Sequence, residues 1–351
     1  MTLLFQKIHG MTQRSAIRAN NDALKKANYK GRGLFELAKC GDKYASFIRE
    51  YSRSNVKMER PPAFLTDPDN PIVICVVKDD LMRMHLFLQY YRKLGIKQFA
   101  IMDDCSSDGT KEFLMAQKDV AMFTEQLGYT TLRRQVWIQK MIEMIGLYRW
   151  YLIVDSDELF DFKDSDKISL REFAISLKLK GRTRSKAILL DMFSEDALYS
   201  ARIREPEDIT RVCNLFYPKY QLDKNQYDTM VRGGAREILI AGIQVSPWVS
   251  KYPLVFVDEL DVMLNSHYCF PFTRNRPAAP ASVLRHYKFL PGDRKKYNER
   301  ITKGNFLNNS QDYKAYAELE KHIDYRSFSA KLIEYIDFNS TASIPVMRSG
   351  R

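Results

Sequence analysis

The stretch YLIVDSDELF, residues 151–160, begins with a run of apolar residues and then places three carboxylates within four positions. The apolar run is typical of a strand that is buried on both faces. Carboxylates this close together repel one another unless a positive charge lies between them or water screens them. The stretch therefore predicts a buried strand that delivers Asp155, Asp157 and Glu158 to a functional site.

Strands and helices alternate along the chain before this stretch. Residues 71–78, PIVICVVK, form a continuous apolar run rich in β-branched side chains, and residues 97–104 and 120–124 predict two further strands. The spacing of apolar residues predicts helices over 81–95 and 131–147. This alternation predicts an α/β fold with a mostly parallel central sheet and right-handed crossovers.

Acidic residues follow three of the four predicted strands. In open parallel sheets, ligands bind beyond the carboxyl ends of the strands, so we expect these acids to gather on one rim. Two carboxylates at positions i and i+2 can share one hard divalent cation such as Mg²⁺ or Mn²⁺. The residues concerned are Asp79 and Asp80 after the first strand, Asp103 and Asp104 after the second, and Asp155 and Asp157 after the fourth.

Other interpretations of the same acids fit the sequence less well. An EF-hand loop beginning at Asp155 needs an oxygen ligand at its fifth position and glycine at its sixth, where the chain has Leu159 and Phe160. An aspartyl phosphatase would have threonine or valine after its acid pair, where Glu158 stands. A glycosidase with paired carboxylates would not need a metal-binding pair at the end of a parallel strand.

The composition limits the class of protein and its partners. Among 351 residues, Lys and Arg number 55 and Asp and Glu 43, which gives a net charge of +12. Such a charge favours a polyanionic partner, namely nucleotide phosphates, nucleic acid or an anionic membrane surface. The five cysteines are scattered, which argues against a disulfide framework or a zinc ribbon. They indicate a protein of a reducing compartment. Because no stretch approaches the ~20 apolar residues of a membrane helix, we expect a cytoplasmic protein that is soluble or peripherally bound at the inner face of the cell membrane.

Three motifs in the first half resemble those of family 2 glycosyltransferases with a GT-A fold, in particular a bacterial surface-polysaccharide subgroup. They are VVKDD at 76–80, LGIKQFAIMDDCSSDGT at 94–110 and RWYLIVDSDELF at 149–160. The resemblance implies a Rossmann-like nucleotide-diphospho-sugar transferase fold with Mn²⁺ or Mg²⁺ as cofactor. The donor would be a nucleotide sugar, UDP-linked by default.

The resemblance also assigns roles to individual residues. Asp155 and Asp157 would meet the metal and the donor diphosphate, and His286 would complete the metal shell, with His267 as the alternative. Asp-Asp stands at 79–80 where the subgroup usually has Asn-Glu, which puts the contact with the nucleobase in doubt. The nucleotide-sugar contacts implied are Lys78, Asp79, Asp80, Asp103, Asp104, Arg134, Asp155 and Arg236.

The chain after residue 165 carries the acceptor side in this interpretation. VRGGAREILI at 231–240 resembles the subgroup, and its two glycines would let the backbone approach a ligand closely. The family's order of elements favours Glu237 as the general base, with Asp191 as the second candidate. An ion pair between Glu237 and a nearby arginine remains the purely structural alternative.

The expected domains are a basic helical extension at 1–69, a nucleotide-sugar-binding half at 70–165, an acceptor-binding half at 166–290 and a basic helical segment at 291–351. The last segment would rest on an anionic membrane surface or present a solvated helix face. The resemblance implies sugar transfer, with inversion, to a hydroxyl of a glycan or lipid-linked acceptor in surface-polysaccharide or lipopolysaccharide synthesis.

Two rival functions remain open. A nucleotidyltransferase also uses acids and a metal on an α/β sheet, but it usually has a glycine-rich loop after its first strand, and VVKDDLMRM contains no glycine. A non-enzymatic nucleic-acid-binding protein would use the net charge of +12 but would leave the acid-rich rim without a purpose. We therefore do not expect nucleic acid to be the partner.

Overall fold

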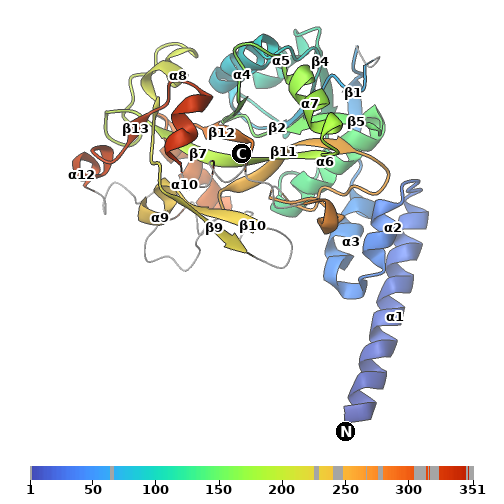
Figure 1. Cartoon of the computed structure of the whole chain (residues 1–351). Helices are drawn as coiled ribbons and strands as arrows, with labels where there is room; N and C mark the ends of the chain where they lie inside the picture. Colours follow the sequence, from blue (N-terminus) through green and yellow to red (C-terminus); the bar gives the residue numbers. More distant parts are fainter. Residues whose placement is uncertain are drawn as a thin grey trace.

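The computed structural model describes residues 2–63, 67–224, 229–239, 248–265, 267–275, 280–303 and 324–344, together with 314, 316 and 347. Figure 1 shows a mixed α/β body with a long N-terminal helix, α1, projecting from one side. The expectation of an α/β fold is therefore confirmed. Among the described residues, no helix has the length and apolar character required to span a membrane.

One large sheet forms the centre of the molecule, with the strand order β1-β4-β3-β2-β5-β11-β7-β12-β6. Strands β4, β3, β2 and β5 are mutually parallel, and they are the four strands that the sequence predicts. The other half is mixed, because β11 runs antiparallel to both of its neighbours while β7 and β12 are parallel. The strands are β1 (Lys57–Arg60), β2 (Ile72–Val77), β3 (Phe99–Asp103), β4 (Val120–Thr124), β5 (Arg149–Ile153), β6 (Glu158–Phe162), β7 (Arg184–Phe193), β11 (Ser250–Val257) and β12 (Ser282–His286).

Apolar layers cover both faces of the parallel half. Alternate residues of β2 point to opposite faces, so Val73 packs in the core on one side and Ile74 in the core on the other. Helix α4 contributes Phe87 to the first core, and helix α6 contributes Trp137 to the second. Each such buried side chain stabilises the fold by about 1.5–3 kcal/mol. The helices flanking this half are α4 (Leu81–Lys93), α5 (Thr110–Met115), α6 (Thr131–Ile145) and α7 (Leu170–Leu179).

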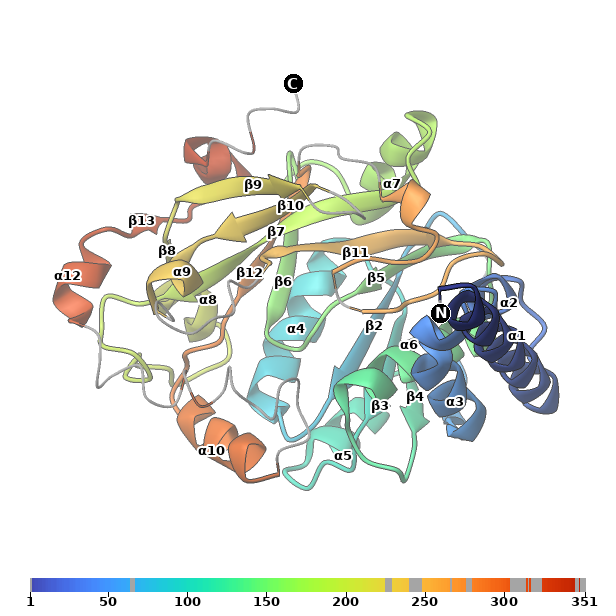
Figure 2. The ribbon, with the colours of Figure 1, turned by 90° about the horizontal axis from the view of Figure 1, so that it is seen from below.

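The N-terminal segment is tied into this core. It forms helices and ends in strand β1, which joins the sheet antiparallel to β4. The buried carboxylate of Glu125 accepts a hydrogen bond of 2.8 Å from the hydroxyl of Ser54 and links the segment to the end of β4. Figure 2 shows these helices gathered beside α6. They are α1 (Thr2–Lys26), α2 (Gly33–Ala38), the 3₁₀ helix η1 (Gly41–Tyr44) and α3 (Ala45–Arg53).

The second half adds small elements around β7 and β12. Gly233 and Gly234, expected to let the backbone approach a ligand, lie against Lys219 and Tyr220. A Cβ on Gly233 would stand 2.7 Å from the carbonyl oxygen of Lys219. Both glycines have positive φ. The remaining elements are α8 (Asp208–Val212), β8 (Leu215–Phe216), β9 (Tyr220–Lys224), β10 (Thr229–Gly233), α9 (Ala235–Leu239), η2 (Phe272–Arg274), α10 (Asp293–Lys303), α12 (Tyr325–Ser329), β13 (Ile333–Glu334) and η3 (Phe338–Ser343).

Candidate active site

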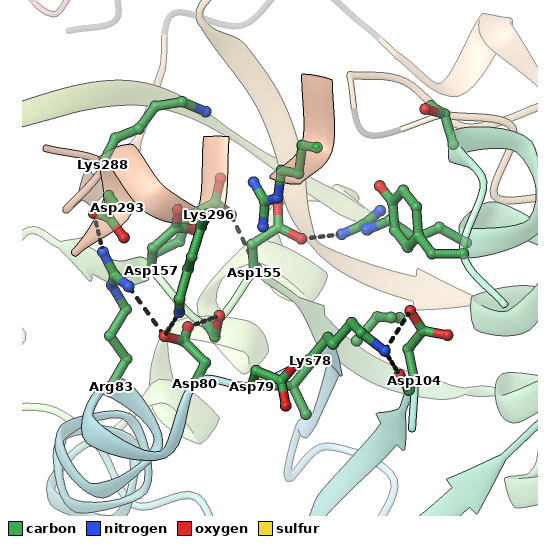
Figure 3. Close-up of a pocket in the computed structure, with 18 of the residues that line it drawn as sticks. Lys78, Asp79, Asp80, Arg83, Asp104, Asp155, Asp157, Lys288, Asp293 and Lys296 are labelled. Carbon is green, nitrogen blue, oxygen red and sulfur yellow. Dashed lines mark hydrogen bonds and ion pairs between the residues drawn. The ribbon is translucent and has the colours of Figure 1, made fainter. Parts of the chain in front are cut away.

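A cavity of about 510 Å³ lies at the carboxyl ends of β2 and β5. Residues from both halves of the sheet and from helix α10 line it, as Figure 3 shows. The position follows from the topology, because side chains that leave the same end of parallel strands reach a common rim. Of the residues expected to form the site, the cavity lining includes Lys78, Asp79, Asp80, Asp104, Arg134, Asp155, Asp157, Arg236, His267 and His286.

The acidic stretch is the connection between β5 and β6. Strand β5 ends at Ile153 and β6 begins at Glu158, although these two strands are not neighbours in the sheet. Residues 154–157 therefore pass from the parallel half to the far edge of a curved sheet. The carbonyl oxygen of Asp157 accepts a hydrogen bond of 2.8 Å from the backbone N–H of Tyr287, which fixes the turn against the end of β12.

Asp157, Glu158 and His286 form the acid–histidine group of the cavity. Each has one ligand atom within 4.8 Å of the others, in the part of the chain that the structure describes. His286 Nε2 lies 3.3 Å from Asp157 Oδ2. The group follows from strand register, because His286 of β12 stands opposite Glu158 of β6. Two carboxylates and an imidazole suit a divalent transition metal such as Mn²⁺, so the residues present fit the expected cofactor.

Asp191 lies behind His286, on the side away from Asp157. Strand β7 runs beside β12 with Asp191 opposite His286, and His286 Nδ1 is 2.6 Å from Asp191 Oδ1. The guanidinium of Arg236 donates to both oxygens of Asp191, at 2.8 and 2.9 Å. Burial raises the pKa of the Asp191 carboxyl, but the charges and hydrogen bonds of Arg236 and His286 outweigh that effect and hold it well below its ordinary value.

Asp155 is held by cations rather than by the acid–histidine group. Arg134 donates to its Oδ1, and Lys251 Nζ lies 3.3 Å from its Oδ2. Lys251 also pairs with Glu158. Burial raises the pKa of Asp155, and the charges of Arg134 and Lys251 overcome this and hold that pKa below its ordinary value. In this structure Asp155 is therefore ionised and paired on both oxygens.

Asp80 anchors another part of the cavity wall. Its Oδ1 accepts hydrogen bonds from Arg83 at 3.0 Å and Lys296 at 2.7 Å, and its Oδ2 accepts one from Ser156 at 2.6 Å. Figure 3 shows Arg83 and Lys296 converging on this carboxylate. Asp80 thus connects the end of β2 to the acidic turn and to helix α10. Arg83 also pairs with Asp293, the first residue of α10.

The remaining acids of the first two strands lie around the loop that follows β3, where Lys78, Asp79 and Asp104 form a separate corner of the cavity. Lys78 Nζ donates to the carbonyl oxygen of Asp104 at 2.5 Å and thereby closes the loop after β3 onto β2. Asp79 Oδ1 accepts from the backbone N–H of Ser107 at 2.6 Å. Asp103 is almost completely buried and is not part of the lining; its Oδ2 accepts from the N–H of Ser106 at 3.2 Å.

The two acids expected to act as the base are not placed as a base would be. Glu237 lies on α9 with its side chain exposed, and it is not among the residues that line the cavity. Asp191 is also absent from the lining, and both of its oxygens are engaged by Arg236. The structure therefore gives Asp191 the position of a support for His286.

The structure adds residues to the set that the sequence proposed as ligands. Glu158 is one of the three acids that the stretch 151–160 was expected to deliver, so the sequence signalled it, although not as a metal ligand. Lys251 carried no such signal, because it reaches Asp155 only through the pairing of β11 with β5. Lys288, Lys296 and the exposed acid Glu299 also line the cavity.

Comparison with known proteins adds little to this picture. No protein-family model and no curated protein matches the chain. Among solved structures, the chain is similar to a mannosyltransferase from Pyrobaculum calidifontis in complex with GDP-Man and Mn²⁺, with 12% sequence identity and a TM-score of 0.31. That match covers 81% of this chain and 79% of the other. A similarity at this level assigns neither a family nor a function.

Proposed function

We propose that this protein is a metal-dependent glycosyltransferase with a GT-A fold, which moves a sugar from a nucleotide-sugar donor to a hydroxyl group. The observation that supports this most is the acid–histidine group of Asp157, Glu158 and His286 in a cavity with abundant lysine and arginine. A divalent cation and further positive charge both stabilise the negative charge of a bound nucleoside diphosphate. The sequence motifs after the first, second and fourth predicted strands support the same conclusion.

Asp157, Glu158 and His286 would hold the cation. When bound, a divalent cation supplies positive charge to the departing diphosphate. A third donor, His286, adds the nitrogen ligand that distinguishes this site from one designed for Mg²⁺, which prefers oxygen ligands. We therefore propose Mn²⁺ over Mg²⁺ as the cofactor.

The cations of the cavity would orient the donor and stabilise the leaving group. Lys288 and Lys296 line the same cavity as Asp157, and Arg134 and Lys251 flank Asp155. Positive groups that are fixed before reaction stabilise developing negative charge without reorganising, which lowers the barrier for departure of the diphosphate. The corner formed by Lys78, Asp79 and Asp104 would hold the nucleoside.

The acceptor would enter beside helix α10, which contributes residues to the cavity from the second half of the chain. A hydroxyl that attacks the anomeric carbon must lose its proton to a base within hydrogen-bond reach. Glu299 is a carboxylate of α10 that is exposed and lines the cavity, so we propose it as the proton acceptor. The acceptor class proposed is a glycan or a lipid-linked sugar.

The test is a transfer assay with purified protein, a panel of UDP- and GDP-sugars, Mn²⁺ and simple sugar acceptors, following release of nucleoside diphosphate. We expect release with one donor, its loss in EDTA, and a decrease of more than about 100-fold in the Asp157→Asn variant. Asp166→Asn, an exposed acid outside the cavity, is the matched control and should retain full activity. Equal rates for Asp157→Asn and Asp166→Asn would contradict the proposal.

A further inference from the structure

We propose that Asp191 is a positioning residue that holds His286 with its Nε2 toward the cation, and that Arg236 holds Asp191 in place. The inference rests on the proposed function, because it concerns the cation site of that function. It assigns to Asp191 a role different from proton transfer.

Strand register brings the side chains of Glu158, His286 and Asp191 into one row across three neighbouring strands. Glu158, His286 and Asp191 occupy directly opposed positions of β6, β12 and β7. Side chains at opposed positions of neighbouring strands point to the same face of the sheet and lie side by side. His286 therefore stands between the acid–histidine group on one side and Asp191 on the other, and its two ring nitrogens face different carboxylates.

The contacts decide which nitrogen carries the proton. His286 Nδ1 lies 2.6 Å from Asp191 Oδ1, a distance at which an ionised carboxylate must accept a hydrogen bond. The Arg236 Nη2 atom lies 3.0 Å from the same nitrogen and donates to Asp191 Oδ1 at 2.9 Å. Nδ1 therefore carries a proton, and the lone pair available to a cation is on Nε2, which faces Asp157 at 3.3 Å.

Arg236 compensates the negative charge of Asp191 at this buried position. The side chains of Arg236 and Asp191 are only 11% and 2% exposed. An unpaired charged carboxylate at that depth would be strongly unfavourable in free energy. The two hydrogen bonds from Arg236 keep the carboxylate ionised and fix its plane, so that one oxygen is directed at Nδ1.

The same contacts argue against other roles for Asp191. It does not line the cavity, so neither a donor sugar nor an acceptor hydroxyl can reach it directly. Both oxygens are engaged, and the residue is 3% exposed. A carboxylate that orients a metal-binding histidine typically changes metal affinity by about 10- to 100-fold when it is removed.

The experiment is a double-mutant cycle on the full-length protein, with Mn²⁺ affinity measured by electron paramagnetic resonance of the free ion. The four proteins are the wild type, Asp191→Asn, His286→Asn and the double variant. We expect Asp191→Asn to weaken Mn²⁺ binding by about 10- to 100-fold in the wild-type background and by less than about 2-fold when His286 is already replaced. The same loss in both backgrounds would overturn the inference, because the effect would then not pass through His286.

A replacement variant and the Mn²⁺ affinity of the wild type keep the experiment decisive if Asp191→Asn does not fold or has no effect. If Asp191→Asn does not fold, as judged by circular dichroism and thermal unfolding, Arg236→Lys replaces it in the cycle, since it retains the charge but loses the two-point contact with Asp191. It should reproduce the His286-dependent loss, and the absence of any change in affinity would overturn the inference. A folded wild type that binds no Mn²⁺ would refute the proposed cation site itself, whereas tight binding with no effect of Asp191→Asn refutes only the positioning role.

Discussion

The ammonium group of Lys251 lies 3.3 Å from Asp155 Oδ2 and also pairs with Glu158, so one cation joins the first and last acids of the stretch Asp155-Ser156-Asp157-Glu158. This contact shows how the chain tolerates three carboxylates within four residues. Asp155 and Glu158 each pair with a fixed cation of the protein, and Glu158 also belongs to the acid–histidine group. Asp157 faces the imidazole of His286, which leaves it as the acid best placed to receive an added cation.

Removing Lys251 should therefore destabilise the fold. Lys251→Met leaves Asp155 with one partner and Glu158 without its ion pair, and breaking a buried pair in this way costs about 3 kcal/mol of unfolding free energy. Urea denaturation in EDTA measures the change. Lys118→Met, at an exposed position, is the control and should change stability by less than about 0.5 kcal/mol. Equal stability of the two variants would refute the role of Lys251.

The placement of Glu237 makes a prediction about catalysis. Its side chain is exposed and outside the cavity lining, so Glu237→Gln should leave the transfer rate within about 2-fold of the wild type. Glu299→Gln should lower kcat by about 100-fold or more, because general-base catalysis contributes about 10²- to 10⁴-fold. Rates of both variants at saturating donor and Mn²⁺ decide between the two acids. The reverse order of effects would return the role of base to Glu237.

The pair of Arg184 and Asp261 should dominate the stability of the second half. Arg184 Nη2 lies 2.5 Å from Asp261 Oδ1, and the two side chains are 1% and 0% exposed. Arg184→Met leaves Asp261 buried with less compensation, for an expected loss of about 3–5 kcal/mol in unfolding free energy. Arg182→Met, two residues away and exposed, is the matched control. A loss of less than about 1 kcal/mol in the Arg184 variant would show that the pair is dispensable.

His267 should make the fold sensitive to acid. Burial lowers the pKa of His267 from 6.5 to about 4, with smaller contributions from the charges of Lys251 and Arg236 and against a hydrogen bond to the carbonyl of Ser250. Between these two pKa values the unfolded chain binds more protons than the folded one, so the free energy of unfolding falls as the pH decreases from 6.5 toward 4. The contribution of neutral His267 to stability is fully present above pH 6.5.

Denaturant unfolding of the wild type and of His267→Asn at pH 7.5 and 5.0 tests this. At pH 5.0 the wild type should have lost about 2 kcal/mol more than the variant, since each pKa unit corresponds to about 1.4 kcal/mol. Parallel losses in the two proteins would mean that another group titrates.

The parallel half of the sheet could be predicted because its signals are local. Each of β2, β3, β4 and β5 is a short apolar run, and the helices between them show their own periodicity, so their parallel direction follows from chain connectivity. The strand pairing of the mixed half gave no such signal. Strand β11 enters between β5 and β7 by antiparallel pairing with both, and this depends on contacts between residues far apart in the sequence.

The site residues also divide into those that local sequence signals predict and those that depend on long-range strand pairing. Asp155, Asp157 and Lys78 could be placed on one rim because they follow parallel strands. The row of Glu158, His286 and Asp191 depends on the registers of β6, β12 and β7, which no local pattern specifies. Asp103 was expected in the cavity beside Asp104, but it is the almost completely buried last residue of β3, and only Asp104, in the loop that follows, belongs to the cavity lining.

The most direct test of the central claim is calorimetric titration of the folded protein with a panel of nucleoside diphosphates, in Mn²⁺ and then in EDTA, for the wild type and Asp157→Asn. We expect that one nucleotide binds the wild type in Mn²⁺, that EDTA abolishes this binding, and that Asp157→Asn does not bind it under either condition. Nucleotide binding of equal affinity with Mn²⁺ and with EDTA, or unchanged by Asp157→Asn, would contradict a metal-dependent donor site at this acid–histidine group.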